Sequence, residues 1–212
     1  MRGSCKALIR LALTPTLSRR EREFSLNANP VETEGSLLER KPVDLKSLIR
    51  DIPDFPKKGI LFRDITTLLK DKTAFQKVVQ RFASYYEDEE IDKVVGIESR
   101  GFILGAPLSF LLAAGFVPVR KPGKLPADIH EVKYELEYGS GTLAIHQDAI
   151  AKGERVLLVD DLLATGGTMA AAVELIRKMG GVIVGVAFLV ELGDLGGRKK
   201  LPGIDIVSMV TY

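Results

Sequence analysis

The sequence of 212 residues has one cysteine, two histidines and no long apolar run. Cys5 cannot form a disulfide within the chain, which fits a reducing compartment. The spacing of His130 and His146 from each other and from Cys5 matches no zinc-binding pattern. No apolar stretch reaches the roughly 20 residues needed to cross a bilayer. These absences exclude a disulfide scaffold and a zinc site, and they predict a soluble, cytoplasmic protein without a membrane partner.

An excess of one sign of charge is also absent over most of the sequence. Residues 1–41 hold eight Lys and Arg against five Asp and Glu, whereas residues 42–212 hold 22 against 23. Proteins that bind nucleic acid normally show a concentrated basic face. The nearly neutral body therefore predicts no nucleic-acid partner, and any anionic ligand is expected to be small and locally held.

Residues 1–41 differ in composition from the rest. The first 20 contain five Lys and Arg and no acid, a composition that also occurs in organelle-targeting leaders. The stretch that follows is polar, rich in turn residues and without sustained periodicity. This predicts a disordered extension or an incorrectly assigned start, followed by one folded domain over residues 42–212, a length that suits a single core.

Apolar strands alternate with helical patterns in this domain. Asp44 is expected to cap a short helix that Pro53 ends, and Asp71 or Thr73 to cap a helix at residues 73–89. Further helices are expected at 101–115 and 168–181, and strands at 93–97, 116–120, 132–139, 141–146, 155–161, 182–190 and 204–210. The alternation predicts an α/β fold with a mainly parallel, twisted sheet flanked by helices. Ligands of such sheets bind beyond the carboxyl ends of the strands.

Two adjacent acids and a small, hydroxyl-rich turn occupy one strand end, in VLLVDDLLATGGTM at residues 156–169. The free amides at the start of the next helix form an anion site, which bare glycine backbone and threonine hydroxyls complete. A Walker A loop is excluded because its lysine is missing and the glycine spacing differs. Asp160 and Asp161 would repel a phosphate unless they bind hydroxyl groups or a metal. A ribose 5-phosphate, with its diol on the acids directly or through Mg²⁺, satisfies both features.

This stretch resembles the phosphoribosyl-pyrophosphate signature of the type I phosphoribosyltransferases. Three further segments resemble the members of that family that act on adenine: DFPKKGILFRDITTLLKD, GIESRGFILGAPLS and RKPGKLPADIHEVKYELEYG. With VELGDLGGRKKL, the resemblance covers about residues 44–212. It implies the type I phosphoribosyltransferase fold with a small amino-terminal hood, and a homodimeric, Mg²⁺-dependent enzyme of purine salvage. The implied reaction transfers ribose 5-phosphate from phosphoribosyl pyrophosphate to adenine, which gives AMP and pyrophosphate.

The resemblance also assigns residues to the phosphate ends of the substrate. Asp160 and Asp161 orient the sugar, and a non-proline cis peptide is expected within Glu98–Arg100. The residues implied for the 5-phosphate are Ala164, Thr165, Gly166, Gly167 and Thr168, and those for pyrophosphate are Ser99, Arg100, Gly101, Arg120, Lys121 and Lys124. Without the resemblance, the last three would indicate an ordinary solvated cluster in a mobile Pro/Gly loop.

The base-binding residues depend most on the resemblance. It implies that Phe62 stacks on the purine, that Leu162 packs on the opposite face, and that Glu137, with Tyr138, manages a proton on the base. A core role for Phe62 and a surface strand for YELEYG stay open. Arg63 is left open between a base contact and a salt bridge with Asp64.

Three other functions compete with this interpretation. They are transfer to another base (xanthine, guanine or orotate), a catalytically silent purine-responsive regulator, and a relic that only binds ribose phosphate. The first 41 residues are too few for a winged-helix domain, which disfavours the regulator. A formal dinucleotide-binding fingerprint, GSGTLA at residues 139–144, is rejected because it leads into a strand pattern and not a helix.

Overall fold

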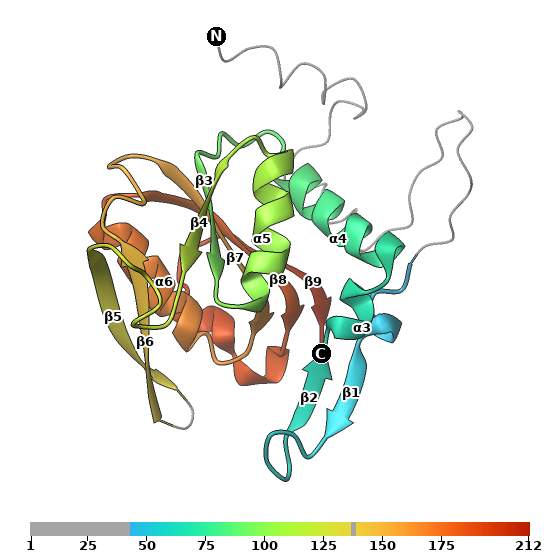
Figure 1. Cartoon of the computed structure of the whole chain (residues 1–212). Coiled ribbons are helices and arrows are strands. Elements are labelled where there is room, and N and C mark those ends of the chain that lie inside the picture. Colours follow the sequence, from blue (N-terminus) through green and yellow to red (C-terminus); the bar gives the residue numbers. More distant parts are fainter. Residues whose placement is uncertain (1–42, 137–138) are drawn as a thin grey trace, which may run out of the picture. The chain divides into compact units, whose positions relative to one another are not determined.

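The computed structural model describes residues 43–136 and 139–212 (Figure 1). Two compact units divide the chain, the first ending at Val78 and the second running from Val79 to Tyr212. Their boundary falls inside one helix, α4 (Lys72–Tyr85). Each unit is considered by itself below.

The first unit contains short elements. Asp44 accepts a hydrogen bond at Oδ1 from the backbone N–H of Lys46 (3.0 Å), as predicted for a cap, but the helix η2 (Lys46–Leu48) has a single turn. Strands β1 (Arg50–Pro53) and β2 (Leu61–Asp64) pair antiparallel, and α3 (Thr66–Leu69) follows. The proline- and glycine-broken stretch thus forms no long element, as expected, although cross-strand pairing gives it a small hairpin.

Helix α4 follows directly from its sequence pattern. The backbone N–H groups of Thr73 and Ala74 both donate to Asp71 Oδ1 at 2.9 Å, so Asp71 and not Thr73 caps the helix. The buried apolar side chains recur at helical spacing, as at Val78 and Phe82. The predicted amphipathic helix is therefore confirmed.

The second unit is built on a five-stranded sheet in which every pairing is parallel. Its strands are β3 (Lys93–Ile97), β4 (Gly115–Val119), β7 (Arg155–Leu163), β8 (Val182–Glu191) and β9 (Ile206–Thr211). The order across the sheet is β4-β3-β7-β8-β9. Near-continuous runs of buried aliphatic residues form the central strands, as expected for a sheet covered on both faces. The predicted α/β fold is confirmed.

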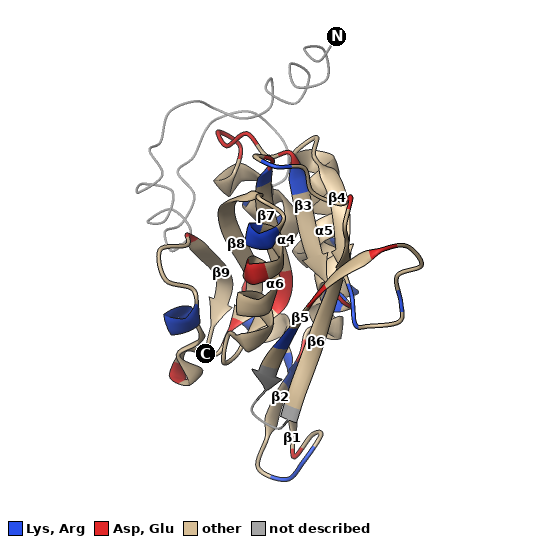
Figure 2. Ribbon diagram, turned by 90° about the vertical axis from the view of Figure 1, so that its left-hand side faces the viewer, with Lys and Arg blue, Asp and Glu red and all other residues tan. Residues whose placement is uncertain are grey.

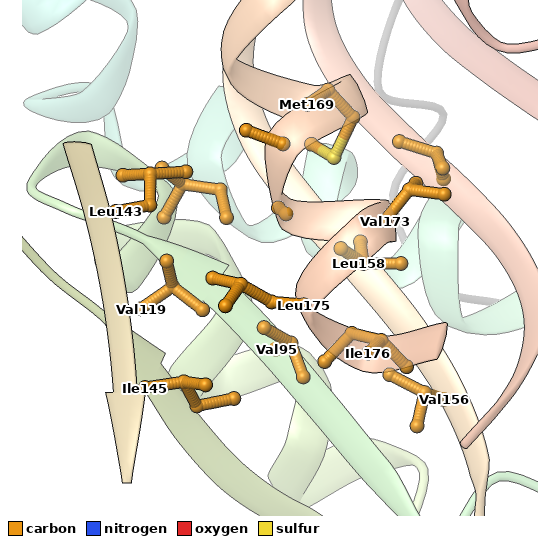
Figure 3. Close-up of a cluster of buried hydrophobic side chains, with 14 of the residues drawn as sticks. Val95, Val119, Leu143, Ile145, Val156, Leu158, Met169, Val173, Leu175 and Ile176 are labelled. Carbon is orange, nitrogen blue, oxygen red and sulfur yellow. The ribbon is translucent and has the colours of Figure 1, made fainter. Parts of the chain in front are cut away.

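Helices cover the two faces of this sheet (Figure 1). Helix α5 (Arg100–Leu111) contacts β3, β4 and β7, and α6 (Gly167–Lys178) contacts β7 and β8 on the other face. Figure 3 shows Leu175 and Ile176 of α6 directed toward Val95 and Val156 of the sheet. All four side chains are fully buried. Burial of each such aliphatic side chain contributes roughly 1.5–3 kcal/mol, so this packing fixes α6 on the sheet.

A hairpin of β5 (Ile129–Leu136) and β6 (Gly139–His146) adds to the α6 side. Leu143 and Ile145 of β6 join the core cluster (Figure 3). The hairpin prediction is confirmed. The GSGTLA segment lies in β6, which agrees with the rejection of a dinucleotide-binding fingerprint there. Figure 2 shows acidic and basic residues interspersed along the ribbon in that view, in keeping with the nearly neutral composition of residues 42–212.

Some predicted boundaries were wrong. Helix α5 ends at Leu111 and not at Gly115, because Ala113 adopts a positive φ of 52° and Gly115 begins β4. Strand β7 continues beyond the predicted end at Asp161 to Leu163, and α6 begins at Gly167, one residue before the predicted start. Both acids of the DD pair belong to the strand, as predicted.

The strand order places a topological switch point between β3 and β7. The chain leaves β3 through α5 to reach β4 on one side, whereas β7 pairs with β3 on the other side, with Gly96 opposite Val159. Connections that leave in opposite directions open a crevice at the carboxyl ends of the two strands. The segments that follow β3 and complete β7 are therefore expected to share one site.

Candidate functional site

Asp160 and Asp161 lie near the carboxyl end of β7 and are both buried, with residue exposures of 9% and 7%. The backbone N–H of Asp161 donates to Asp160 Oδ1 at 2.9 Å. Burial raises the pKa of Asp160 well above its usual range, and the neighbouring Asp161 charge raises it further. Two adjacent buried carboxyl groups are costly without partners. Such a pair is suited to accept hydrogen bonds from a ligand diol.

Arg100 is the cationic partner of this acid pair. Its Nε lies 2.7 Å from Asp161 Oδ2. Burial raises the pKa of Asp161, and the Arg100 charge opposes that rise. Sequence analysis assigned Arg100 to pyrophosphate and Asp161 to the sugar, whereas the structure joins them in one ion pair. The residues assigned to the sugar and to the pyrophosphate are therefore in direct contact with each other.

The turn between β7 and α6 has the conformation of an anion cradle. Gly166 has a φ of +79° just before α6, and a Cβ there would lie 2.4 Å from the Gly197 carbonyl oxygen. Only glycine fits this position, for both reasons. The first backbone N–H groups of α6 have no partner within the helix, and they carry the positive end of its dipole. Thr165 and Thr168, both partly exposed, flank these amides.

The turn between β3 and α5 lies against the end of β7. The Glu98–Ser99 peptide is cis, within the segment where a cis peptide was expected. A Cβ on Gly101 would lie 2.7 Å from the Val159 carbonyl oxygen and 3.1 Å from Asp160 Oδ1. Ser99 is exposed and Arg100 partly exposed. The structure therefore brings the Ser99–Gly101 segment and the acid pair together.

The basic loop after β4 is held by Glu98. Lys124 Nζ donates to Glu98 Oε1 at 2.6 Å, while Arg120 Nε and the Lys121 backbone N–H donate to Oε2 at 3.2 and 3.1 Å. Arg120 Nη1 also donates to the Lys124 carbonyl oxygen at 3.1 Å. Burial alone would raise the pKa of Glu98, but the hydrogen bonds from Lys124, Lys121 and Arg120 outweigh it and lower the pKa to about 2. Glu98 therefore stays charged.

Glu98 was missed as a functional residue by the sequence analysis. It was considered only as a neighbour of Ser99 and Arg100, since its partners lie 22 to 26 residues later in the chain. One signal was present, because an acid at a strand end beside predicted anion-binding residues has to have cationic partners. The cations of the 120–124 loop were among the candidates, together with the neighbouring Arg100.

A second missed network supports the phosphate cradle from β8. Arg198 donates to both Glu191 carboxylate oxygens at 2.7 Å, and Ser208 Oγ donates to Glu191 Oε2 at 2.7 Å. Gly197, next to Arg198, lies so close to the cradle that an added Cβ would be 2.4 Å from the Ala164 carbonyl oxygen. The segment after β8 and the cradle after β7 are therefore in backbone contact.

The base-binding candidates of the first unit have local partners. The Phe62 ring meets the Phe55 ring edge to face, with centroids 5.1 Å apart. Arg63 forms an ion pair with Asp51, its partner across the β1–β2 hairpin. Asp64, the other partner considered for Arg63, pairs with Arg50, whose Nε donates to Asp64 Oδ2 at 3.1 Å.

The structure says less about the remaining predicted site residues. Leu162 is partly exposed on β7. Glu137 and Tyr138 lie outside the described residues, so their catalytic role stays a prediction. Residues 1–41, with their leader-like start, also lie outside them.

The described residues contain no group of three or more His, Cys, Asp or Glu side chains arranged to hold a metal ion. The available donors are the two carboxyl groups of Asp160 and Asp161. Mg²⁺ is commonly bound through one or two carboxylates together with substrate phosphates and water. The acid pair therefore fits a magnesium ion that binds chiefly through substrate oxygens. Likewise, no helix in the described part of the chain is long and apolar enough to span a bilayer.

Comparison with protein families identifies one matching model. The phosphoribosyl transferase domain model matches residues 65–210. Two curated relatives, both named adenine phosphoribosyltransferase, come from Acaryochloris marina and Halothermothrix orenii. The first is 61% identical over 170 residues (80% of this chain and 100% of the relative), and the second 58% identical over 168 residues (79% and 99%).

Solved structures give the same result. The adenine phosphoribosyltransferase from Thermoanaerobacter pseudethanolicus is 52% identical, with a TM-score of 0.77, over 80% of this chain and 98% of that one. The Saccharomyces cerevisiae enzyme, crystallised with adenine and an imino-altritol bisphosphate, is 40% identical, with a TM-score of 0.75, over 78% and 96%.

Proposed function

The chain belongs to the phosphoribosyl transferase family, within its adenine phosphoribosyltransferases, and we propose how its described residues carry out the reaction. The enzyme is a pentosyltransferase that transfers ribose 5-phosphate from phosphoribosyl pyrophosphate to adenine in purine salvage. The products are AMP and pyrophosphate. The single observation that best supports this assignment of roles is the meeting of the acid pair, the glycine cradle and the Ser99–Gly101 turn at one switch point.

The sugar phosphate is bound at the end of β7. The α6 amides and the residues of Ala164–Thr168 hold the 5-phosphate, because unpaired N–H groups and the helix dipole both favour an anion there. Asp160 and Asp161 accept hydrogen bonds from the two ribose hydroxyls. These contacts fix the anomeric carbon relative to both the leaving group and the incoming base.

The departing pyrophosphate is bound by cations and amides from two segments. Arg100 and the Ser99–Gly101 amides come from the turn after β3, and Arg120, Lys121 and Lys124 come from the loop after β4. As the glycosidic bond breaks, negative charge grows on the leaving group and positive charge on the ribose ring. Fixed cations at one end and the acid pair beside the ring stabilise both charges.

A magnesium ion is part of this proposal. When bound, Mg²⁺ neutralises charge on the pyrophosphate, and Asp160 and Asp161 would hold it through water molecules. The described residues hold the sugar and the diphosphate in place whether or not the acids touch the ion directly.

The base contacts depend on the resemblance. We propose that Phe62, Arg63 and Leu162 contact adenine, and that Glu137, assisted by Tyr138, holds or releases the proton on the purine imidazole nitrogens. The match of the family model to residues 65–210 supports treating residues 42–212 as one phosphoribosyltransferase domain. A cytoplasmic location is supported by the single cysteine, which suits a reducing compartment.

Helix α5 supports the proposal of a homodimer. Ile103, Ala106 and Phe110 are exposed along one side of the helix, with Phe110 81% exposed. Spacings of three and four residues place them on one stripe, and exposed apolar stripes mark interaction surfaces. Sedimentation velocity is expected to give a dimer, and Phe110→Lys to shift it toward monomer. A monomeric wild type would refute this part of the proposal.

The adenine specificity is tested with a base panel. Pyrophosphate release from phosphoribosyl pyrophosphate is measured with adenine, hypoxanthine, guanine, xanthine and orotate offered separately, with and without Mg²⁺. We expect pyrophosphate release only when adenine is the base and Mg²⁺ is present. Preferential release with another base would reassign the substrate, and release with none would support the silent regulator or the relic.

A further inference from the structure

A largely buried carboxylate lies among the residues assigned to pyrophosphate. Glu98 follows β3 directly, and its side chain is only 9% exposed. An acid at this point repels a diphosphate unless its charge is more than balanced nearby. Its presence among predicted anion-binding residues calls for a physical reason.

The contacts of Glu98 supply that reason. Its Oε1 accepts a hydrogen bond from Lys124, and its Oε2 accepts bonds from the Arg120 side chain and the Lys121 backbone. One carboxylate therefore links the turn after β3 to both ends of the 120–124 loop. The link includes a main-chain donor, so it fixes the path of the loop and not only its side chains.

The local charge count shows that the region still attracts an anion. The loop carries three cations, Arg120, Lys121 and Lys124, against one carboxylate, and two of them, Arg120 and Lys124, form ion pairs with it. Lys121 is exposed and forms no ion pair with any described residue. Its ammonium group is therefore available to an arriving diphosphate, while the other two cations are already held beside the Ser99–Gly101 turn.

Two roles for Glu98 are physically possible. It either competes with pyrophosphate for the loop cations or arranges them in advance. Competition requires the carboxylate to give up its bonds when the diphosphate arrives, but a buried carboxylate that loses three donors is left with a large desolvation cost. If Glu98 arranges the loop cations before the substrate binds, the entropy cost of binding is lower, because the substrate does not have to order the loop. The observed contacts favour the second role.

We propose that Glu98 is a positioning residue of the pyrophosphate site, which holds the Arg120–Lys124 loop against the β3–α5 turn before the substrate binds. This inference rests on the proposed function, because it concerns the leaving-group end of that site. Glu98 itself does not contact the reacting atoms. Its effect is exerted on the affinity for phosphoribosyl pyrophosphate and for pyrophosphate.

The test is steady-state kinetics of the full chain in both directions, with wild type, Glu98→Gln and Glu98→Asp. Loss of the charged bonds is expected to raise KM for phosphoribosyl pyrophosphate and for pyrophosphate by about tenfold or more. KM for adenine is expected to stay near the wild-type value, and kcat to change less than either raised KM. Glu98→Asp keeps the charge with a shorter reach, so it is expected to lie between wild type and Glu98→Gln.

A matched control is Glu89→Gln, which removes an ion pair of 2.6 Å with Arg155 at the opposite, amino-terminal end of β7. It is expected to leave all three KM values unchanged. Pyrophosphate affinity is also measured by calorimetry, so that Glu98→Asp decides the matter if Glu98→Gln does not fold.

Three outcomes would overturn the proposal. Unchanged KM values would show that the loop needs no such support, and tighter pyrophosphate binding would show that Glu98 is a competitor. An equal loss in every kinetic parameter together with a lower melting temperature would show a purely structural role. An inactive wild type would instead count against the proposed function, so the two failures are distinguishable.

Discussion

At the residue scale, Asp161 combines three properties that define its role. It is buried, it follows another buried acid, and it forms an ion pair with Arg100 at 2.7 Å. Asp161→Asn keeps the shape and removes the charge, so it weakens both the sugar contact and the placement of Arg100. We expect turnover to fall by tens-fold or more, on the scale of a lost charged contact in a transition state.

The measurement for Asp161→Asn is kcat with saturating substrates, alongside circular dichroism to verify folding. Glu174→Gln serves as control, since it removes only a half-exposed pair with Lys178 on α6. Activity equal to wild type would remove Asp161 from the catalytic site.

Glu137 is predicted to act on the base and not on the sugar phosphate. Glu137→Gln removes the proton-handling carboxylate while keeping its size. We therefore expect a lower kcat with little change in affinity for phosphoribosyl pyrophosphate. Steady-state kinetics separates the two effects. A variant with normal kcat and weakened affinity would contradict the assigned role.

Residue identities in the site were predictable where they form a local pattern. Asp160, Asp161 and the glycine cradle are contiguous, and their chemistry can be interpreted without knowing the fold. Pairings across long separations were not predictable. The sequence indicates that Glu98 needs cationic partners, but it does not identify Lys124 as one of them, nor Asp51 as the partner of Arg63. Each pair is brought together by strand order or hairpin register.

At the element scale, the cradle depends on the segment after β8. A Cβ on Gly197 would lie 2.4 Å from the Ala164 carbonyl oxygen and 2.8 Å from Leu163 Cδ1. Gly197→Ala therefore has to displace either the cradle or its own segment, and overpacking of this kind costs roughly 1–3 kcal/mol. We expect a raised KM for phosphoribosyl pyrophosphate, with KM for adenine unchanged.

Gly193→Ala is the matched control for this prediction. It lies four residues earlier in the same segment, and its Cβ would meet nothing closer than 3.4 Å. Kinetics of the two variants side by side provide the test. Equal behaviour of the two would show that the segment after β8 does not shape the phosphate site.

Element types were largely predictable and their ends were not. Runs of buried aliphatic residues indicated the strands, and the Asp71 cap indicated α4. The end of β7 was placed too early because polar acids usually mark the end of a buried strand. Here β8 pairs with β7 as far as Leu163, so tertiary pairing extends the strand past the acids.

At the scale of the whole molecule, the carboxylates with lowered pKa values set the acid stability. Glu98 has an ordinary pKa of 4.5 and a folded pKa of about 2. Its stabilising contribution is present above pH 4.5 and is lost as the pH falls toward 2, because the unfolded chain then binds a proton that the folded chain does not. The raised pKa values of Asp160 and Asp161 act in the opposite sense, since ionisation of these buried acids as the pH rises lowers stability.

Denaturant unfolding of wild type and Glu98→Gln at several pH values measures this contribution. We expect the wild type to be the more stable at pH 7, and the difference in unfolding free energy to shrink as the pH falls from about 4.5 toward 2. A difference that stays constant over this range would show that the Glu98 bonds do not stabilise its charged form.

The fold class followed from the alternation of strands and helices, and the location of the site followed from the rule that ligands bind beyond the carboxyl ends of parallel strands. The strand order itself was not predictable from one sequence, because parallel strands of similar composition can be arranged in several ways. The order β4-β3-β7 brings segments 98–101, 120–124 and 160–168 to one edge of the sheet.

The central claim is that the acid pair and the adjoining cradle bind the activated sugar diphosphate. Calorimetric titration of phosphoribosyl pyrophosphate with Mg²⁺ into wild type and into the double variant Asp160→Asn/Asp161→Asn tests it most directly. Saturable one-to-one binding to wild type is predicted, with a large loss of affinity in the double variant. No binding to wild type, or equal affinity in both proteins, would contradict the claim.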